Sequence, residues 1–160
     1  MKPFLKWAGG KSKLLNEIDL RLSYSSLRDF TYVEPFVGGG ASIFNVLGKY
    51  PVKQAVISDI NPDLMNAYRV VANAPDELIT VLGRLQDDYH SLMTDEKAKK
   101  EFYYEKRALF NERWVDRVTQ ASLMIMLNKT CFNGLYRVNS SNGFNVPIGS
   151  YKKPIICDQK

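Results

Sequence analysis

The spacing of apolar and polar residues divides the chain into two parts. Near the N-terminus, short β-prone stretches at residues 31–33 and 54–58 alternate with helical patterns at residues 11–22 and 41–47. From residue 62 onwards, helical spacing dominates, with apolar residues three and four positions apart. The pattern predicts a strand–helix–strand–helix order that is followed by a helical insertion.

Four of the predicted helices carry an apolar stripe, and some helices have a clear starting signal. Asn61-Pro62 supplies an N-cap and a first-turn proline for one helix, and residues 74–76 precede the next. A charged helix is predicted over residues 95–111, and residues 54–58 are predicted to be a buried strand. The apolar stripes comprise Leu14, Leu15, Ile18 and Leu22; Leu64, Ala67, Tyr68 and Val71; Leu78, Val81, Leu82 and Leu85; and Trp114, Val118, Ala121 and Ile125.

The periodicity ends in the last quarter of the chain. Residues 129–150 are rich in Asn, Gly, Ser and aromatic residues, which predicts a long ordered loop or hairpin of the kind that carries function. Residues 154–157 are compatible with the start of a third strand. A parallel sheet of so few strands would leave a hydrophobic edge and face uncovered. We therefore expect either self-association or a missing C-terminal segment that completes the sheet.

Composition narrows the class of protein only slightly. The 160 residues are 45% hydrophobic and 24% charged, as in ordinary globular proteins, and the net charge of +5 gives a weak preference for a polyanionic partner. The longest apolar run, residues 121–127, is too short to cross a bilayer, and the N-terminus lacks the apolar core of a secretory signal. Cys131 and Cys157 lack metal-ligand spacing. We expect a cytoplasmic protein with no membrane association and no metal site.

A glycine-rich turn and a downstream acid suggest a nucleoside pocket. Gly38-Gly39-Gly40 lies between the first strand and a helix, and Asp59 follows at the end of the second strand. Such a turn lets the backbone approach a ligand, and the acid can accept hydrogen bonds from ribose hydroxyls. Spacing alone does not separate this reading from a plain turn and a helix cap, or NAD from S-adenosylmethionine. The carboxylate of Glu34 would repel a pyrophosphate but suits the ammonium group of a methionine moiety.

Five motifs follow one another along the chain: Phe-Leu-Lys-Trp-Ala-Gly-Gly-Lys at 4–11, Glu-Pro-Phe-Val-Gly-Gly-Gly at 34–40, Ser-Asp-Ile-Asn at 58–61, Asn-Gly-Leu-Tyr-Arg-Val-Asn at 133–139 and Gly-Phe-Asn-Val-Pro-Ile-Gly at 143–149. Their order resembles that of Dam-type (D12 class) DNA adenine methyltransferases over nearly the whole chain. The resemblance implies an α/β fold that is part of a Rossmann-like S-adenosylmethionine-dependent methyltransferase core.

The resemblance also divides the chain by function. Residues 1–60 would be the first part of the core, residues 61–151 a helical target-recognition domain, and residues 152–160 the start of the return to the core. A β-hairpin loop near residues 130–150 would read DNA. The implied reaction transfers a methyl group from S-adenosylmethionine to the exocyclic amino group of adenine in double-stranded DNA, usually within GATC. A role in restriction-modification, replication-linked methylation or a phage stays open.

The cofactor residues are carried over by their positions in the motifs. Trp7 and Lys11 would help to enclose S-adenosylmethionine, Asp59 would hold its ribose, and Ala8 with the backbone of residues 36–40 would line the same pocket. The alternative readings are a core aromatic for Trp7 and a solvated lysine for Lys11. The full predicted set is Trp7, Ala8, Lys11, Glu34, Phe36, Gly38, Gly40, Asp59 and Ile60.

The DNA-reading residues are carried over in the same way. Arg137 matches an arginine that reads guanine, whose O6 and N7 suit a forked donor. Phe132 matches an aromatic residue that inserts near the vacated base stack, and Lys6 matches a contact to another base. Ser150 replaces an arginine of some relatives, which would remove one phosphate contact. The full predicted set is Lys6, Lys129, Phe132, Asn133, Leu135, Arg137, Asn139, Asn145, Pro147, Tyr151 and Lys152.

The family's catalytic motif does not occur among these residues. The resemblance implies an Asp-Pro-Pro-Tyr motif after the recognition segment, but this sequence contains none. We therefore assign no catalytic residue and expect the chain to be incomplete and inactive alone. Two alternatives stay open: a non-catalytic remnant that binds cofactor or DNA, and a Rossmann-type nucleotide enzyme of another chemistry.

Overall fold

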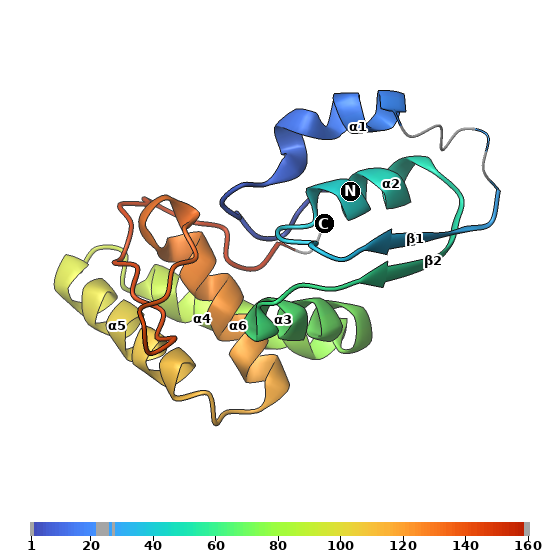
Figure 1. The fold of residues 1–160 in the computed structure, drawn as a ribbon. Helices are drawn as coiled ribbons and strands as arrows, with labels where there is room; N and C mark the ends of the chain where they lie inside the picture. Colours follow the sequence, from blue (N-terminus) through green and yellow to red (C-terminus); the bar gives the residue numbers. More distant parts are fainter. Residues whose placement is uncertain (1, 22–25, 27, 159–160) are drawn as a thin grey trace. The chain divides into compact units, whose positions relative to one another are not determined.

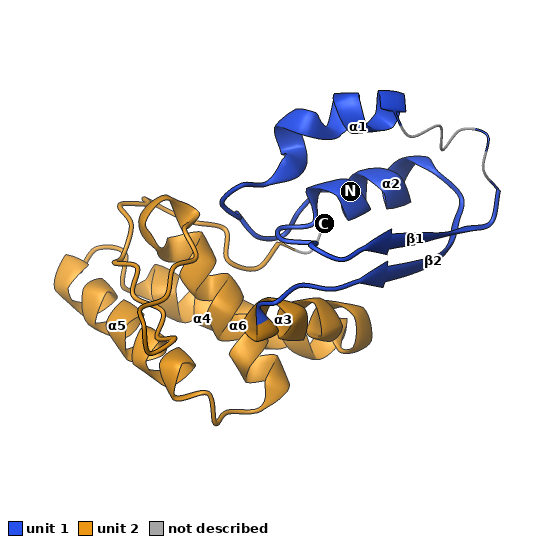
Figure 2. Ribbon diagram, viewed as in Figure 1, with its two compact units in different colours: residues 1–61 blue, residues 62–160 orange. Residues whose placement is uncertain are grey.

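A computed structural model describes residues 2–21, 26 and 28–158. The chain forms two compact units, residues 1–61 and residues 62–160, which are coloured separately in Figure 2. The first contains both strands, and the second contains the four longest helices, as the labels in Figure 1 indicate. The change of pattern near residue 62 therefore coincides with the boundary between the units.

The first unit is built around two parallel strands. Strand β1 (Phe30–Glu34) and strand β2 (Val52–Ile57) are connected by helix α2 (Ala41–Lys49). Tyr32 and Glu34 of β1 are buried, and the Tyr32 hydroxyl lies 2.8 Å from Ser42 Oγ on α2, so α2 packs against this face. On the opposite face, the register partners Val33 and Val56 are 62% and 46% exposed. The expected uncovered apolar face is thus present in this unit.

One prediction for this unit is wrong, and another is confirmed with a difference in detail. Strand β2 begins at Val52, and none of its residues is buried, although a buried strand was expected. The reason is that it pairs only with β1 among the described residues, and its Val56 face has no cover. The predicted helix 11–22 divides into a 3₁₀ turn (Lys11–Leu14) and helix α1 (Leu15–Arg21), neither of which buries a residue. Leu14 is 57% exposed, and Leu22 lies outside the described residues.

The second unit is a bundle around one buried helix. Helices α3 (Pro62–Asn73), α4 (Pro75–Ser91) and α5 (Glu96–Glu112) all pack against α6 (Arg117–Thr130). Residues 120–128 of α6 are buried without exception, as expected for a helix that is surrounded on all sides. The apolar run at residues 121–127 is therefore the core of the bundle.

The start of α6 differs from the prediction. Asp116 is its N-cap, and the carboxylate accepts hydrogen bonds from the amides of Val118 and Thr119, both at 2.9 Å. These bonds satisfy donors that a helix start leaves unpaired. Trp114 therefore precedes the helix and is 78% exposed, so its assignment to the apolar stripe is wrong. No helix in the described part of the chain is long and apolar enough to cross a membrane.

Residues 131–150 form an irregular hairpin without regular strands. Two isolated antiparallel bridges, Cys131 with Ile148 and Val138 with Phe144, connect its limbs, and a 3₁₀ turn occupies Phe132–Gly134. Residues 154–157 do not form the third strand that the sequence suggested. Instead, the amides of Ile156 and Cys157 both donate to Gln86 Oε1 on α4, at 3.0 and 3.2 Å.

Candidate functional site

A cavity lies beside the glycine turn that follows β1. The parallel ladder continues past the strands, because the Ser58 amide donates to the Glu34 carbonyl and the Val37 amide donates to the Ser58 carbonyl, both at 3.0 Å. The chain then turns at Gly38, with φ of 51°, and Gly40, with φ of 82°. These values favour glycine. The turn is therefore fixed at the carboxyl ends of both strands, where open α/β sheets bind ligands.

Trp7 packs directly on this turn. A Cβ atom at Gly39 would lie 2.8 Å from Trp7 Cβ, and one at Gly38 would lie 3.1 Å from Trp7 Cδ1. Only glycine permits this approach without a shift of the indole. The glycine run and Trp7 are thus one packed feature, although about thirty residues separate them in the sequence.

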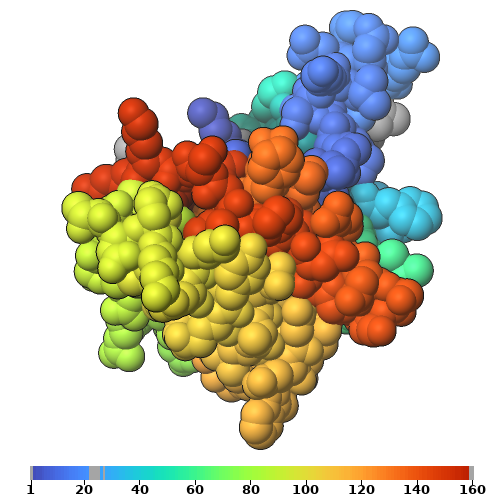
Figure 3. Space-filling model, turned by 90° about the vertical axis from the view of Figure 1, so that its left-hand side faces the viewer, coloured from blue at the N-terminus to red at the C-terminus, as the bar shows by residue number. Residues whose placement is uncertain are grey.

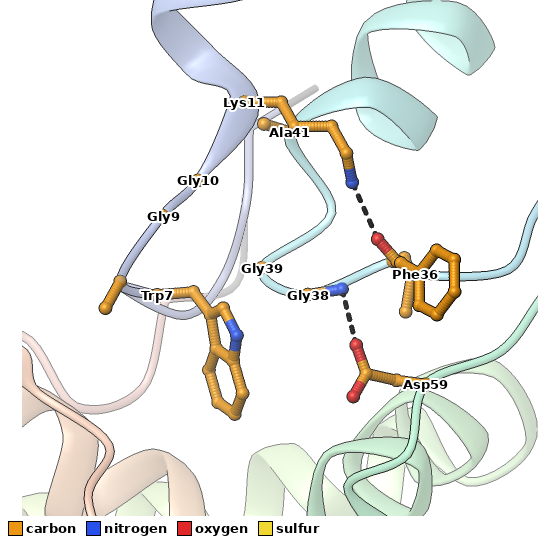
Figure 4. Close-up of a pocket in the computed structure, with 11 residues that line it drawn as sticks. Trp7, Gly9, Gly10, Lys11, Phe36, Gly38, Gly39, Ala41 and Asp59 are labelled. Carbon is orange, nitrogen blue, oxygen red and sulfur yellow. Dashed lines mark hydrogen bonds between the residues drawn. The ribbon is translucent and has the colours of Figure 1, made fainter.

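Asp59 lies on the other side of the cavity and is held by backbone amides. Gly38 N donates to Asp59 Oδ2 at 2.9 Å (Figure 4), and Asn61 N donates to Asp59 Oδ1 at 3.0 Å. Each carboxylate oxygen has capacity for a further hydrogen bond. The carboxylate is therefore oriented in advance and can still accept bonds from a ligand.

Lys11 is fixed by Glu34 and by the turn. Its Nζ donates to Glu34 Oε1 at 3.0 Å and to the Phe36 carbonyl at 2.6 Å. Glu34 also accepts from the Tyr32 hydroxyl at 3.0 Å and is only 6% exposed. Its charge is therefore compensated within the protein, and the side chain does not line the cavity. The expected contact between Glu34 and a ligand ammonium group finds no support in this geometry.

Six of the nine predicted cofactor residues line the cavity, whose volume of about 260 Å³ is near the lower end for ligand pockets. They are Trp7, Ala8, Lys11, Phe36, Gly38 and Asp59. Glu34, Gly40 and Ile60 are not part of the lining. Gly40 is the buried N-cap residue of α2, and Ile60 is 97% exposed. Val37 and Gly39 also line the cavity, as predicted for the backbone of residues 36–40. The prediction missed Gly9, Gly10 and Ala41, although the two glycines belong to a motif that suggested the pocket.

The hairpin of the second unit is held by polar side chains from α5. Asn111 brackets Phe144, because its Oδ1 accepts from the Phe144 amide at 2.8 Å and its Nδ2 donates to the Phe144 carbonyl at 3.1 Å. Tyr103 Oη and Arg107 Nη1 both donate to the Val146 carbonyl, at 2.9 and 3.3 Å. Burial raises the pKa of the Tyr103 hydroxyl, which keeps it a proton donor. One limb of the hairpin is thereby attached to α5.

A second attachment centres on Asp63 of α3. Asp63 Oδ2 accepts from Arg113 Nη2 and from the Tyr136 hydroxyl, both at 3.0 Å. Arg113 Nη2 also donates to the Asn142 carbonyl at the hairpin tip, at 2.7 Å. The Phe144 ring packs against the ring of Tyr136 at a centroid distance of 5.6 Å. None of these holding residues was among the predicted site residues, because their partners are distant in sequence.

The hairpin brings most of the predicted DNA-reading residues together at the surface. Residues 131–150, orange to red in Figure 3, lie at the surface of the helical unit. Phe132 is 52% exposed, and its amide donates to the Pro147 carbonyl at 2.9 Å. Exposed members of the set are Phe132, Asn133, Leu135, Arg137, Asn139, Pro147 and Lys152; half-buried members are Lys129, Asn145 and Tyr151. Lys6 is also exposed but belongs to residues 1–61.

Two asparagines of the set have structural partners. Asn139 Oδ1 accepts from the amides of Ser141 and Gly143, at 3.1 and 2.8 Å, which shapes the hairpin tip. Asn145 Oδ1 accepts from Arg137 Nε at 2.8 Å. Their roles therefore include the conformation of the hairpin itself, which their motif positions did not reveal.

Comparison with known proteins gives a consistent picture. The model of the family described as D12 class N6 adenine-specific DNA methyltransferase matches residues 7–160. The chain is 50% identical over 165 residues to the type II methyltransferase M.MjaIII of Methanocaldococcus jannaschii, in a match that covers 100% of this chain and 56% of the relative. It is 36% identical over 151 residues to a DNA adenine methylase of Haemophilus influenzae, covering 94% and 48%.

A phage protein is also similar. The chain is 35% identical over 153 residues to the DNA N-6-adenine-methyltransferase of Escherichia phage P1, in a match that covers 96% of this chain and 18% of the relative. The chain spans about half the length of the first of these relatives. The match extends through both units and therefore includes the cavity as well as the hairpin.

Proposed function

We propose, because the chain belongs to the D12 class family of N6 adenine-specific DNA methyltransferases, that its first unit binds S-adenosylmethionine and its second unit reads double-stranded DNA. The observation that carries the proposal is the cavity between Trp7, the glycine turn and the amide-held Asp59. The two binding functions serve methylation of the exocyclic amino group of adenine.

The residues around the cavity fit S-adenosylmethionine chemically. The Asp59 carboxylate has acceptor capacity for ribose hydroxyls, Trp7 offers an aromatic surface, and the Lys11 ammonium can pair with the carboxylate of a methionine moiety. When bound, the cofactor supplies the methyl group. The protein residues orient it through backbone atoms that are already fixed by the β1–β2 ladder. Preorganisation of this kind lowers the entropic cost of binding.

The hairpin supports the DNA-reading part of the proposal. Arg137 is exposed, and its forked guanidinium suits the O6 and N7 acceptors of guanine in the major groove. Phe132 is an exposed aromatic residue on the same hairpin, which suits the gap that an extracted base leaves. The target we propose is GATC. The proposal assigns binding and no proton-transfer or methyl-transfer step to residues of this chain.

Calorimetry with three ligands tests the cofactor assignment. We expect the chain to bind S-adenosylmethionine and S-adenosylhomocysteine, which share the adenosine and amino-acid parts. We expect no binding of NAD, because the Gly38 amide, which could otherwise donate to a pyrophosphate oxygen, already donates to the Asp59 carboxylate. Binding of NAD in preference to S-adenosylmethionine would support a Rossmann-type enzyme of another chemistry and contradict the proposal.

Fluorescence anisotropy titrations test DNA reading. A labelled duplex with one GATC site is compared with an otherwise identical duplex in which the G·C pairs of the site are replaced by A·T pairs. We expect tighter binding of the first duplex at equal salt concentration. Equal affinity for the two duplexes would contradict sequence reading, and no binding of either would contradict a DNA partner.

A further inference from the structure

Arg137 and Asn145 are joined twice across the hairpin. The Asn145 amide donates to the Arg137 carbonyl at 3.1 Å, and Arg137 Nε donates to Asn145 Oδ1 at 2.8 Å. The two residues flank the antiparallel bridge between Val138 and Phe144. The backbone hydrogen bond fixes the position of the Arg137 main chain, and the side-chain hydrogen bond fixes the orientation of its guanidinium group.

The side-chain contact selects one edge of the guanidinium group. An arginine can offer guanine either its two terminal nitrogens or Nε together with one terminal nitrogen. Because Asn145 occupies Nε, the two terminal nitrogens of Arg137 remain for a ligand, and they have no hydrogen-bond partner among the described residues. A donor pair of fixed direction can distinguish guanine from adenine, since adenine offers an amino group where guanine offers O6.

Asn145 can act as a support because its own backbone is fixed. Its neighbours Phe144 and Val146 are 3% and 1% exposed, and they alternate with the half-buried Asn145. Asn111 holds the backbone of Phe144, and Tyr103 holds the carbonyl of Val146. The amide side chain of Asn145 therefore has a defined origin, with helix α5 behind it.

We propose that Asn145 is a positioning residue that sets the specificity of DNA reading by orienting Arg137. The proposal rests on the proposed function, in which Arg137 reads guanine. It differs from a direct contact between Asn145 and the DNA, which the membership of Asn145 in the predicted DNA-binding set implies. If Asn145 only positions Arg137, replacing Asn145 should change DNA affinity only when Arg137 is present. If Asn145 contacts DNA directly, the replacement should also weaken DNA binding in a variant that lacks Arg137.

A double-mutant cycle on the GATC duplex and its A·T-replaced counterpart separates these roles. Arg137→Ala should reduce the ratio of the two affinities by about tenfold or more, since a bidentate pair contributes about 1–3 kcal/mol of discrimination. Asn145→Ala should reduce the ratio by about three- to tenfold, the scale of one lost hydrogen bond. In the Arg137→Ala background, Asn145→Ala should leave both affinities nearly unchanged.

Asn145→Asp provides a rescue that a general structural role would not predict. The carboxylate keeps an acceptor for Arg137 Nε, so the affinity ratio should stay close to that of the parent chain. Its negative charge should weaken binding of both duplexes alike. Ser140→Ala, at an exposed position of the hairpin tip, is the matched control and should change neither affinity. Circular dichroism checks that each variant is folded. If Asn145→Ala is not folded, the comparison of Asn145→Asp with the parent chain provides the test.

The outcomes distinguish the two proposals. An unchanged ratio for Arg137→Ala would contradict the reading role of Arg137 and with it the proposed function. A reduced ratio for Arg137→Ala together with an unchanged ratio for Asn145→Ala would overturn the positioning role alone. An equal loss from Asn145→Ala in both backgrounds would overturn it as well and would support a direct DNA contact.

Discussion

In residues 1–61 the cavity is formed by residues 7–11 and by the turns at the carboxyl ends of two paired strands. In residues 62–160 the hairpin is instead held by helices that are distant in sequence. Gly38, after β1, donates a hydrogen bond to Asp59, which follows the paired strand β2. By contrast, the hairpin contacts Asn111 over 33 positions and Asp63 over 73 positions, measured from Phe144 and Tyr136. The cavity therefore depends on the βαβ unit and on the N-terminal segment that packs against it, while the hairpin depends on contacts with helices α3 and α5.

The two units also differ in how well they bury their apolar residues. Strand β2 has no buried residue and Val33 is 62% exposed, whereas α6 is buried from residue 120 to 128. Burial of apolar surface is the main favourable term in folding. We infer that most of the stability of this chain comes from the helical unit, and that substitutions there have the largest effects on folding.

The largest expected effect comes from Asp63→Ala. This substitution removes the partner of Arg113 and of the Tyr136 hydroxyl at a site where the Asp63 side chain is only 8% exposed. Breaking such a pair leaves a largely buried charge without a counterion, which costs about 3–5 kcal/mol. Urea unfolding followed by far-ultraviolet circular dichroism measures the loss.

Asp76→Ala is the control for this prediction, because Asp76 is an exposed acid in the first turn of α4. Its removal should cost about 0.3–1 kcal/mol through the helix dipole. If Asp63→Ala were no more destabilising than Asp76→Ala, the hairpin would not depend on the Asp63 network, and the contrast between the units would lose its main support.

The sequence predicts the residues of the cavity better than the residues that hold the hairpin. The physical reason is that the cavity residues belong to local motifs, whereas the hairpin is held by residues that are distant in sequence. Gly38 and Asp59 are identified by a strand–turn–helix pattern, in which the glycine and the acid occupy defined positions. Six of nine predicted residues accordingly line the cavity. Glu34 was assigned to the ligand because the sequence does not reveal that Lys11 neutralises it.

Helix boundaries in the bundle follow from capping signals, but the hairpin contacts do not. Asp95 and Asp116 cap α5 and α6, and Asp116 explains why Trp114 is outside the helix. Asn111 and Tyr103, however, look like ordinary residues of an amphipathic helix. Their importance depends on the path of residues 131–150, which no local pattern specifies. Long-range side-chain to backbone hydrogen bonds are thus the part of the site that the sequence does not reveal.

The next largest effect concerns cofactor affinity. Asp59→Ala should weaken S-adenosylmethionine binding by about 1.5–3 kcal/mol, because hydrogen bonds to a charged acceptor are lost. Calorimetry measures the change, and Glu17→Ala provides the control, since Glu17 is 61% exposed on α1 and pairs with Arg21. An unchanged affinity for Asp59→Ala would remove Asp59 from the ribose assignment, whatever happens to the fold.

Two glycine substitutions, one in each unit, are expected to change the free energy of unfolding in opposite directions. Gly39→Ala places a Cβ 2.8 Å from Trp7 Cβ, and this overpacking should cost about 1–3 kcal/mol and weaken cofactor binding. Gly83→Ala lies within α4 and meets no atom within 4 Å, so it should stabilise the bundle by about 0.5–1 kcal/mol. Thermal unfolding of both variants checks the signs; a stabilising Gly39→Ala would show that the close contact with Trp7 is not required.

The smallest expected effect tests the general attraction of the second unit for DNA. Lys152 is exposed, and we expect it to contribute charge near the DNA backbone rather than base reading. Lys152→Ala should weaken binding of the GATC duplex and of its A·T-replaced counterpart equally, by roughly fivefold at physiological salt, and should reduce the slope of log affinity against log salt by about one unit.

Lys97→Ala is the control that distinguishes a local phosphate contact of Lys152 from a general effect of net charge. Lys97 is 87% exposed and lies 3.9 Å from Glu101 on α5, so its removal changes the net charge of the chain by the same amount as Lys152→Ala. A phosphate contact at Lys152 requires that only Lys152→Ala reduces the salt slope, because released counterions reflect the phosphates that are neutralised. Equal reductions for both lysines would show that net charge alone attracts the DNA. A fall in the affinity ratio for Lys152→Ala would instead show that this lysine takes part in reading the sequence, the role that we propose for the hairpin pair Arg137 and Asn145.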